Sequence, residues 1–243
     1  MEMFMSENYQ TPPIIEAVVE FRFAEPISFE TIVKKADRIK RLYPQETQTY
    51  EFSGEFSERG WSGTQTVVGL RLTTKNDLEI VLVNLQNYII ARLAPYVGWE
   101  EFKARVIRDY GILSESYGRR SIARIGVRYI NRIDVPTTPT DVDRYLTVFP
   151  SVPSFGQTYA KGFALQSTFE YSDPRFTVTL QSATVDAPPV PGTNALLLDI
   201  DVACTVDIPT RDDQILQLLD DMRAIKNSVF EAAITDEARK LFR

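Results

Sequence analysis

The chain has 243 residues, of which 44% are hydrophobic and 25% charged, which is ordinary for a globular protein with a sizeable core. Its net charge of −6 argues against a general affinity for nucleic acid or anionic lipid, because either would require a dominant positive field. No apolar run reaches the roughly 20 residues of a membrane helix, and the N-terminus has no secretory pattern. We therefore expect a cytoplasmic protein with no membrane or nucleic acid partner.

The sequence contains no histidine, which removes the commonest general base, the Ser-His and Cys-His nucleophile pairs and most zinc sites. The single cysteine, Cys204, cannot form an internal disulfide and lies on the apolar phase of an expected strand. Phosphate-binding glycine motifs and CxxC pairs are also absent from the sequence. These absences favour a non-catalytic protein with no cofactor or metal, and any enzyme would have to use carboxylates, Lys, Arg or Tyr.

The first half begins with a strand, Ile14–Phe23, in which apolar and charged residues alternate. Ser28 is expected to cap a helix over Phe29–Tyr43, with Val33 and Leu42 among the residues of its apolar side. Antiparallel strands are then expected at 47–57, 64–74, 78–86 and 88–93, with turns at 60–63 and 75–77.

A helix over Trp99–Tyr117 closes the first half, and it is expected to pack through Trp99, Phe102, Val106, Ile107 and Tyr110. Trp99 has a second interpretation, in which its ring stacks on a ligand. An aromatic residue at a helix start next to another aromatic is more often a core residue.

From residue 121 the same order of elements recurs. We expect a strand over Arg124–Ile133, a short helix near Thr140–Phe149, strands over 162–171, 175–185 and 195–206, and a long helix over Asp212–Ile234. Thr235 is expected to cap a last turn, and Asp186–Thr193 to be the most mobile loop.

Both halves therefore have the pattern strand, helix, antiparallel strands, long helix. This repetition predicts an α+β fold built from two similar halves, residues 1–118 and 119–243, packed about a pseudo-two-fold axis in one globular unit. The apolar residues near the end, Phe230, Ile234, Leu241 and Phe242, either close the core or form a dimer or partner surface.

Arg124, Arg128 and Arg132 lie on one face of the central strand. A row of guanidinium groups suits a phosphate-rich ligand, because each fork matches an oxyanion and keeps its charge at cellular pH. The alternative interpretation is that carboxylates of the same chain neutralise the row.

The chain supplies these carboxylates at two places. When the two halves are aligned, Glu16 falls on Arg124 and Glu20 on Arg128, so equivalent positions carry opposite charges and cross-strand pairs are expected. Asp199 and Asp201 share a strand face and are further partners for the row; two carboxylates alone make a weak metal site.

Several stretches of the chain carry a resemblance to a known family. They are PPIIEAVVEFRF at Pro12–Phe23, YVGWEEF at Tyr96–Phe102, IGVRYINRID at Ile125–Asp134, LLLDIDV at Leu196–Val202 and FEAAITDEARKLF at Phe230–Phe242. In these stretches the sequence resembles a sporadically distributed bacterial protein family of unknown function. The resemblance implies a bacterial or phage origin and a defence or mobile-element neighbourhood, with no catalytic residues to carry over.

Together these features lead to two hypotheses on function. The first is a non-catalytic binding or interaction protein, an accessory or sensor component of a bacterial defence or mobile-element system, with a protein partner or a homodimer. The second is a protein that binds an anionic, nucleotide-like small molecule through the arginine row between the two halves.

Overall fold

The computed structural model describes residues 9–57, 60–135, 141–151, 162–185 and 194–243. The described chain is mixed α+β, and nine strands form an antiparallel sheet in the order β2-β3-β4-β5-β1-β6-β9-β8-β7. It divides into two compact units, the first comprising residues 1–17, 94–96 and 126–243 and the second comprising 18–93 and 97–125.

The elements up to residue 117 are β1 (Ile14–Phe23), α1 (Phe29–Lys35), α2 (Asp37–Lys40), β2 (Gln45–Ser57), β3 (Gly60–Thr73), β4 (Glu79–Asn84), β5 (Asn87–Leu93) and α3 (Trp99–Tyr117). Those that follow are β6 (Ile122–Val135), the short 3-10 helix η1 (Val142–Arg144), β7 (Ala164–Glu170), β8 (Phe176–Val185), β9 (Asn194–Cys204), α4 (Asp212–Ala233) and α5 (Asp236–Lys240). The bounds predicted for β1 and α3 are confirmed.

In the second unit, β1 buries alternate residues, as the sequence predicts: Val19, Phe21 and Phe23 are all in the core. Ser28 caps α1, since its hydroxyl accepts a hydrogen bond from the Thr31 amide at 3.3 Å. The long helix predicted over Phe29–Tyr43 is wrong, because the chain forms two short helices separated at Ala36.

Because of this break, fewer apolar residues of the segment face the core than a continuous helix would place there. Ile32, Ala36, Ile39 and Tyr43 are fully buried, whereas Val33 and Leu42, which were expected on the core side, are exposed. Similarly, Ile107 on α3 is exposed, because the buried stripe of that helix passes through two charged residues, Arg105 and Asp109, instead.

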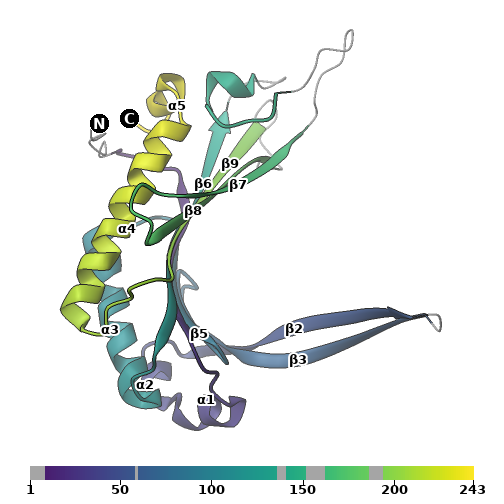
Figure 1. The fold of residues 1–243 in the computed structure, drawn as a ribbon, viewed down its shortest axis with the longest axis vertical. Helices are drawn as coiled ribbons and strands as arrows, with labels where there is room; N and C mark the ends of the chain where they lie inside the picture. Colours follow the sequence, from purple (N-terminus) through teal and green to yellow (C-terminus); the bar gives the residue numbers. More distant parts are fainter. Residues whose placement is uncertain (1–8, 58–59, 136–140, 152–161, 186–193) are drawn as a thin grey trace. The chain divides into compact units, whose positions relative to one another are not determined.

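Strands β2 and β3 extend together as a two-stranded ribbon beyond β4 and β5 (Figure 1). We call the outer part of this ribbon, Tyr50–Ser57 with Gly60–Val67, the arm. The turn predicted at 60–63 is wrong, since these residues pair with Gly54–Ser57 in the ladder. A bulge shifts the register between Thr49 and Tyr50, where β3 turns from the arm toward β4.

In the first unit, α4 contacts β9, and its buried apolar residues recur at helical spacing: Ile215, Leu218, Leu219, Met222, Ile225 and Phe230. Thr235 caps α5 as expected. The helix predicted near 140–149 is wrong in length, since only Val142–Arg144 is helical among its described residues. The loop Asp186–Thr193 lies outside the described residues.

The late apolar residues belong mostly to the core of the first unit. Phe230, Ile234 and Phe242 are buried, and only Leu241 is exposed. Cys204 is buried at the end of β9, as its apolar phase predicts. Among the described residues, none of the helices combines the length and apolar character needed to cross a membrane.

Candidate functional site

The arginine row is engaged by carboxylates of the same chain. Arg124 forms an ion pair with Glu20, and both side chains are mostly buried. Arg128 Nε donates to Asp199 Oδ1 at 2.9 Å, and its Nη2 reaches the other carboxylate oxygen, Oδ2, at 2.5 Å. This fork geometry is the strong form of a charged hydrogen bond.

The surroundings of Arg128 show why this pair persists. The Asp199 hydrogen bond raises the pKa of Arg128, partial burial lowers it, and the negative charges of Asp199, Asp201 and Glu16 raise it further. Asp199 itself is 3% exposed, so removing its guanidinium partner would leave a buried carboxylate without its counter-ion.

Arg132 is engaged less completely. Its Nε donates to Asp134 at 2.8 Å, two residues along the same strand. Its buried Nη2 makes no hydrogen bond within the described residues. The structure therefore brings Arg124 and Arg128 to predicted carboxylates, and Arg132 to a carboxylate that the sequence reasoning did not name.

Trp99 is 5% exposed at the start of α3, with its ring 6.3 Å from that of Phe102 in an edge-to-face contact. The Lys103 ammonium lies 6.0 Å from the indole centroid. Little of the ring surface remains for stacking on a ligand, so the geometry favours the core interpretation.

A buried polar cluster on α3 was missed by the sequence reasoning. Asp109 is fully buried; it accepts from the Tyr43 hydroxyl at 2.5 Å and from Arg108 Nε at 2.9 Å. Arg105 donates to the Tyr43 oxygen at 3.0 Å and to the Ala91 carbonyl at 2.7 Å. Burial, followed by the charge of Asp109, raises the pKa of Tyr43.

This cluster borders a hollow of about 290 Å³ lined in part by Glu79, Glu101, Arg105 and Arg108. Glu79 also pairs with Arg92 at 3.2 Å. The guanidinium groups of α3 donate to Asp109, to the Tyr43 oxygen and to the Ala91 carbonyl of β5, so the arrangement holds α3 against Tyr43 and β5. The signal was present in the sequence: Arg105 and Asp109 fall at i and i+4 within the apolar stripe.

Lys226 is a second buried charge, in the first unit. Its ammonium lies 4.1 Å from the centre of the Tyr129 ring and 5.9 Å from that of Phe230. Burial, assisted by the charge of Arg223 and opposed by Glu231, lowers the pKa of Lys226 from 10.5 to about 7. It occupies the core stripe of α4, four residues after Met222 and four before Phe230.

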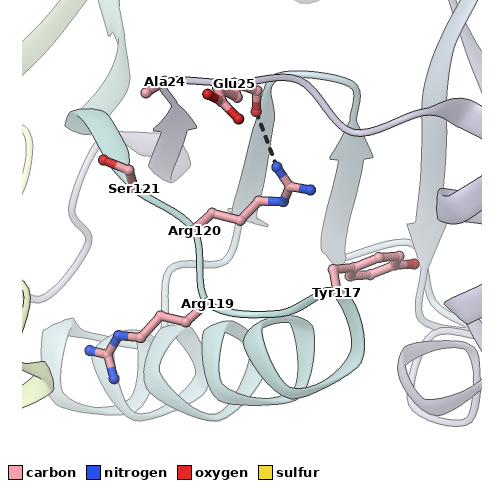
Figure 2. A pocket seen from close by; sticks show the side chains of 6 residues that line it. All are labelled: Ala24, Glu25, Tyr117, Arg119, Arg120 and Ser121. Carbon is pink, nitrogen blue, oxygen red and sulfur yellow. Dashed lines mark hydrogen bonds between the residues drawn. The ribbon is translucent and has the colours of Figure 1, made fainter.

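A larger hollow, of about 440 Å³, lies where α3 ends and β6 begins. Its lining residues are Ala24, Glu25, Tyr117, Arg119, Arg120 and Ser121 (Figure 2). Arg120 reaches across it and donates to the Glu25 carbonyl at 3.3 Å, while Arg119 extends in a different direction. Positive φ at Gly118, 83°, allows the chain to leave the helix toward these residues.

The arm presents the most exposed aromatic surface of the described chain. Phe52 is 76% exposed and Tyr50 45%, and both lie on the same face of β2 because they are two residues apart. Val67 and Gln65 of β3 face them in the ladder. Exposed aromatic side chains of this kind are typical of binding surfaces.

Comparison with known proteins adds no assignment. No family model matches the sequence, and no curated protein is significantly similar to it. The resemblance to an uncharacterised bacterial family therefore stays an expectation. Within the described ranges, no group of three or more acidic or cysteine side chains is placed to hold a metal ion.

Proposed function

We propose that the protein is a non-catalytic interaction protein that binds a second copy of its own chain through the arm. The main support is the exposure of Tyr50 and Phe52 on a two-stranded ribbon. Such a ribbon has no second layer to cover its aromatic face, and an isolated hairpin is only marginally stable in water. Contact with a partner would bury these rings and stabilise the ribbon.

A second copy is the favoured partner because the same unit offers a complementary surface. Val33 on α1 and Leu42, two residues after the end of α2, are exposed, and the residues next to them in sequence include the exposed basic side chains Lys34, Lys35 and Arg41. Of the three glutamates of β2, Glu46 pairs with Lys40 of the same chain, whereas Glu51 and Glu55 lie on the arm, which carries no lysine or arginine. Glu51 falls on the strand face opposite Tyr50 and Phe52, so it adds attraction to a basic partner surface without taking part in the aromatic contact.

The test is the oligomeric state in solution, measured by sedimentation velocity over a range of concentrations. We expect a reversible dimer in the micromolar range, and we expect Phe52→Ser to weaken it by about tenfold or more, as the loss of a buried aromatic anchor does. Phe169→Ser is the matched control, because Phe169 is also an exposed aromatic on an edge strand but lies on β7. A wild-type protein that stays monomeric up to about 200 µM would refute the proposal.

We also propose an internal duplication, with halves 1–118 and 119–243 related by a pseudo-two-fold axis. The strand order supports it, because the first strands of the two halves, β1 and β6, are neighbours. In each half the last strand lies next to the first, and the remaining strands follow outward in reverse chain order. The Glu20–Arg124 ion pair and the effect of Glu16 on Arg128 also support it, because they are reciprocal. Glu16 aligns with Arg124 and Glu20 with Arg128, so each glutamate acts on the counterpart of the other, which is the pattern of a two-fold axis.

The setting of the protein, as an accessory or sensor component of a bacterial defence or mobile-element system in the cytoplasm, is a proposal supported by the sequence resemblance and composition. The alternative function, nucleotide-like binding by the arginine row, is less supported by the geometry. A ligand there would have to displace Glu20 from Arg124 and Asp199 from Arg128.

A further inference from the structure

The hollow beside the buried cluster of α3 is lined by charged groups that the chain uses only in part. Arg108 lines it, and its side chain is 47% exposed, so a solute can reach it. Its Nε donates to Asp109 at 2.9 Å and its Nη2 to the Tyr43 oxygen at 3.1 Å. The third nitrogen, Nη1, has no acceptor among the described residues. The guanidinium is therefore held in place with one donor still open.

Arg105 supplies a second donor to the same lining. Its side chain is 7% exposed and is fixed by hydrogen bonds from Nη1 to Tyr43 and from Nη2 to the Ala91 carbonyl. Its Nε lies 3.9 Å from Glu79 Oε1, which is too long for a hydrogen bond. Because Arg105 and Arg108 donate to the same Tyr43 oxygen, their guanidinium groups are held close together.

Two carboxylates complete the charged lining. Glu79 engages its arginine neighbours Arg92 and Arg105 through one carboxylate oxygen, Oε1. Glu101 is exposed and makes no hydrogen bond or ion pair with the described part of the chain. The lining thus contains two arginines and two glutamates, and their formal charges cancel. A ligand that carries both charges matches this lining better than an anion or a cation alone.

From this geometry we infer that the hollow binds a free α-amino acid with an apolar side chain. The ligand carboxylate accepts from Arg105 Nε and Arg108 Nη1, and the ligand ammonium donates to Glu79 and Glu101. The 3.9 Å between Arg105 Nε and Glu79 Oε1 suits a zwitterion whose two charged groups are attached to one carbon. The volume of about 290 Å³ is near the lower limit for small-molecule pockets, which favours a compact ligand. The apolar part of the lining is formed by Val97, Phe102 and Ala104.

Two simpler reasons account for part of this arrangement. Acidic residues in the first turn of a helix stabilise its N-terminus, which explains Glu100 and Glu101. The buried hydrogen bonds of Arg105 hold α3 against β5. Neither reason requires the remaining donors and both carboxylates to line one hollow, and this convergence carries the inference.

The test is calorimetric titration of the full chain with L-leucine at pH 7. Two comparison compounds each lack one charged group of leucine: 4-methylpentanoate lacks the ammonium, and 3-methylbutylamine lacks the carboxylate. We expect L-leucine to bind with a Kd of about 1 mM or lower, and each comparison compound to bind about tenfold more weakly or worse, because it loses charged hydrogen bonds.

Two variants place the binding in this hollow. Glu101→Gln should weaken L-leucine binding about fivefold or more, whereas Glu100→Gln, the same change one residue earlier, should bind like the wild type because Glu100 is outside the lining. Ala104→Leu fills the hollow from an exposed position of α3, so it should abolish binding while the urea midpoint of unfolding stays near that of the wild type.

Three results would overturn the inference. The first is no binding of L-leucine at about 10 mM. The second is a comparison compound that binds as tightly as L-leucine. The third is binding of L-leucine that neither Glu101→Gln nor Ala104→Leu weakens.

Discussion

Replacing Lys226 with methionine should stabilise the protein near neutral pH. The ammonium is 6% exposed on the core stripe of α4 and lies against the ring of Tyr129. Methionine keeps the length and flexibility of the side chain but carries no charge to desolvate. The gain comes from removing the cost of burying an ammonium.

The size of this gain follows from the pKa. A fall from 10.5 to about 7 corresponds to roughly 5 kcal/mol between the two protonation states. The attraction of the ammonium to the Tyr129 ring offsets about 2 kcal/mol of this cost when the pair is desolvated. Near pH 7 we therefore expect the variant to be about 3 kcal/mol more stable than the wild type.

The stability of the wild type should depend on pH through Lys226, and the variant should lack this dependence. The pKa of Lys226 is lower in the folded state, so between about pH 7 and 10.5 the unfolded chain binds more protons and the stability of the wild type rises with pH. Below pH 7 the destabilisation is fully present. Between pH 7 and 9 we expect the wild type to gain about 2 kcal/mol relative to the variant.

Urea unfolding of both proteins at pH 7 and pH 9 measures this difference. Lys34→Met is the control, because Lys34 is exposed on α1 and its replacement should leave the pH dependence unchanged. The reasoning is refuted if Lys226→Met is less stable than the wild type at pH 7, or if the two proteins respond equally to pH.

Three further predictions concern stability and use the same unfolding assay. Gly69→Ala should cost about 2 kcal/mol or more, because the added Cβ would lie 2.5 Å from the Val83 carbonyl oxygen; an unchanged midpoint would contradict this close approach. Asp109→Asn should cost about 3 kcal/mol, since it removes the buried charge that Arg108 and Tyr43 engage, and a loss below about 1 kcal/mol would contradict that role. Arg128→Leu should lower the free energy of unfolding by roughly 2–3 kcal/mol, and most of this loss should be recovered when Asp199→Leu is added. A double variant that is as unstable as Arg128→Leu alone would contradict the role of the pair.

The local signals of the sequence predicted much of the fold. The alternation of β1, the helical period of α3 and α4, and the caps at Ser28 and Thr235 are all observed. These features depend on residues close in sequence, whose effect on the backbone is direct. The break at Ala36 was not predictable in this way, because Val33 and Leu42 fit a helical stripe equally well.

The candidate site was harder to predict, because it depends on which charges become buried. The core faces of α3 and α4 were predicted from apolar residues alone. Arg105, Asp109 and Lys226 were therefore not expected in the core, although each occupies a core position of its helix. The strands of the arm were predicted over 47–57 and 64–74, but the start of β3 was not. The glycines at 60 and 63 indicated a turn, whereas both residues pair with β2 in the ladder.

A charge exchange between two variants tests the proposed dimer most directly. Lys35→Glu makes the α1 surface more acidic, and Glu51→Lys makes the arm more basic, so each variant alone should dimerise about tenfold more weakly than the wild type. Mixed in equal amounts, the two variants should form a heterodimer. One of its two arm contacts keeps the wild-type charges, and the other has the acidic and basic partners exchanged, so both contacts are attractive. Sedimentation velocity should then show that association recovers. If the mixture remains as monomeric as the separate variants, the arm does not contact α1 of a second copy.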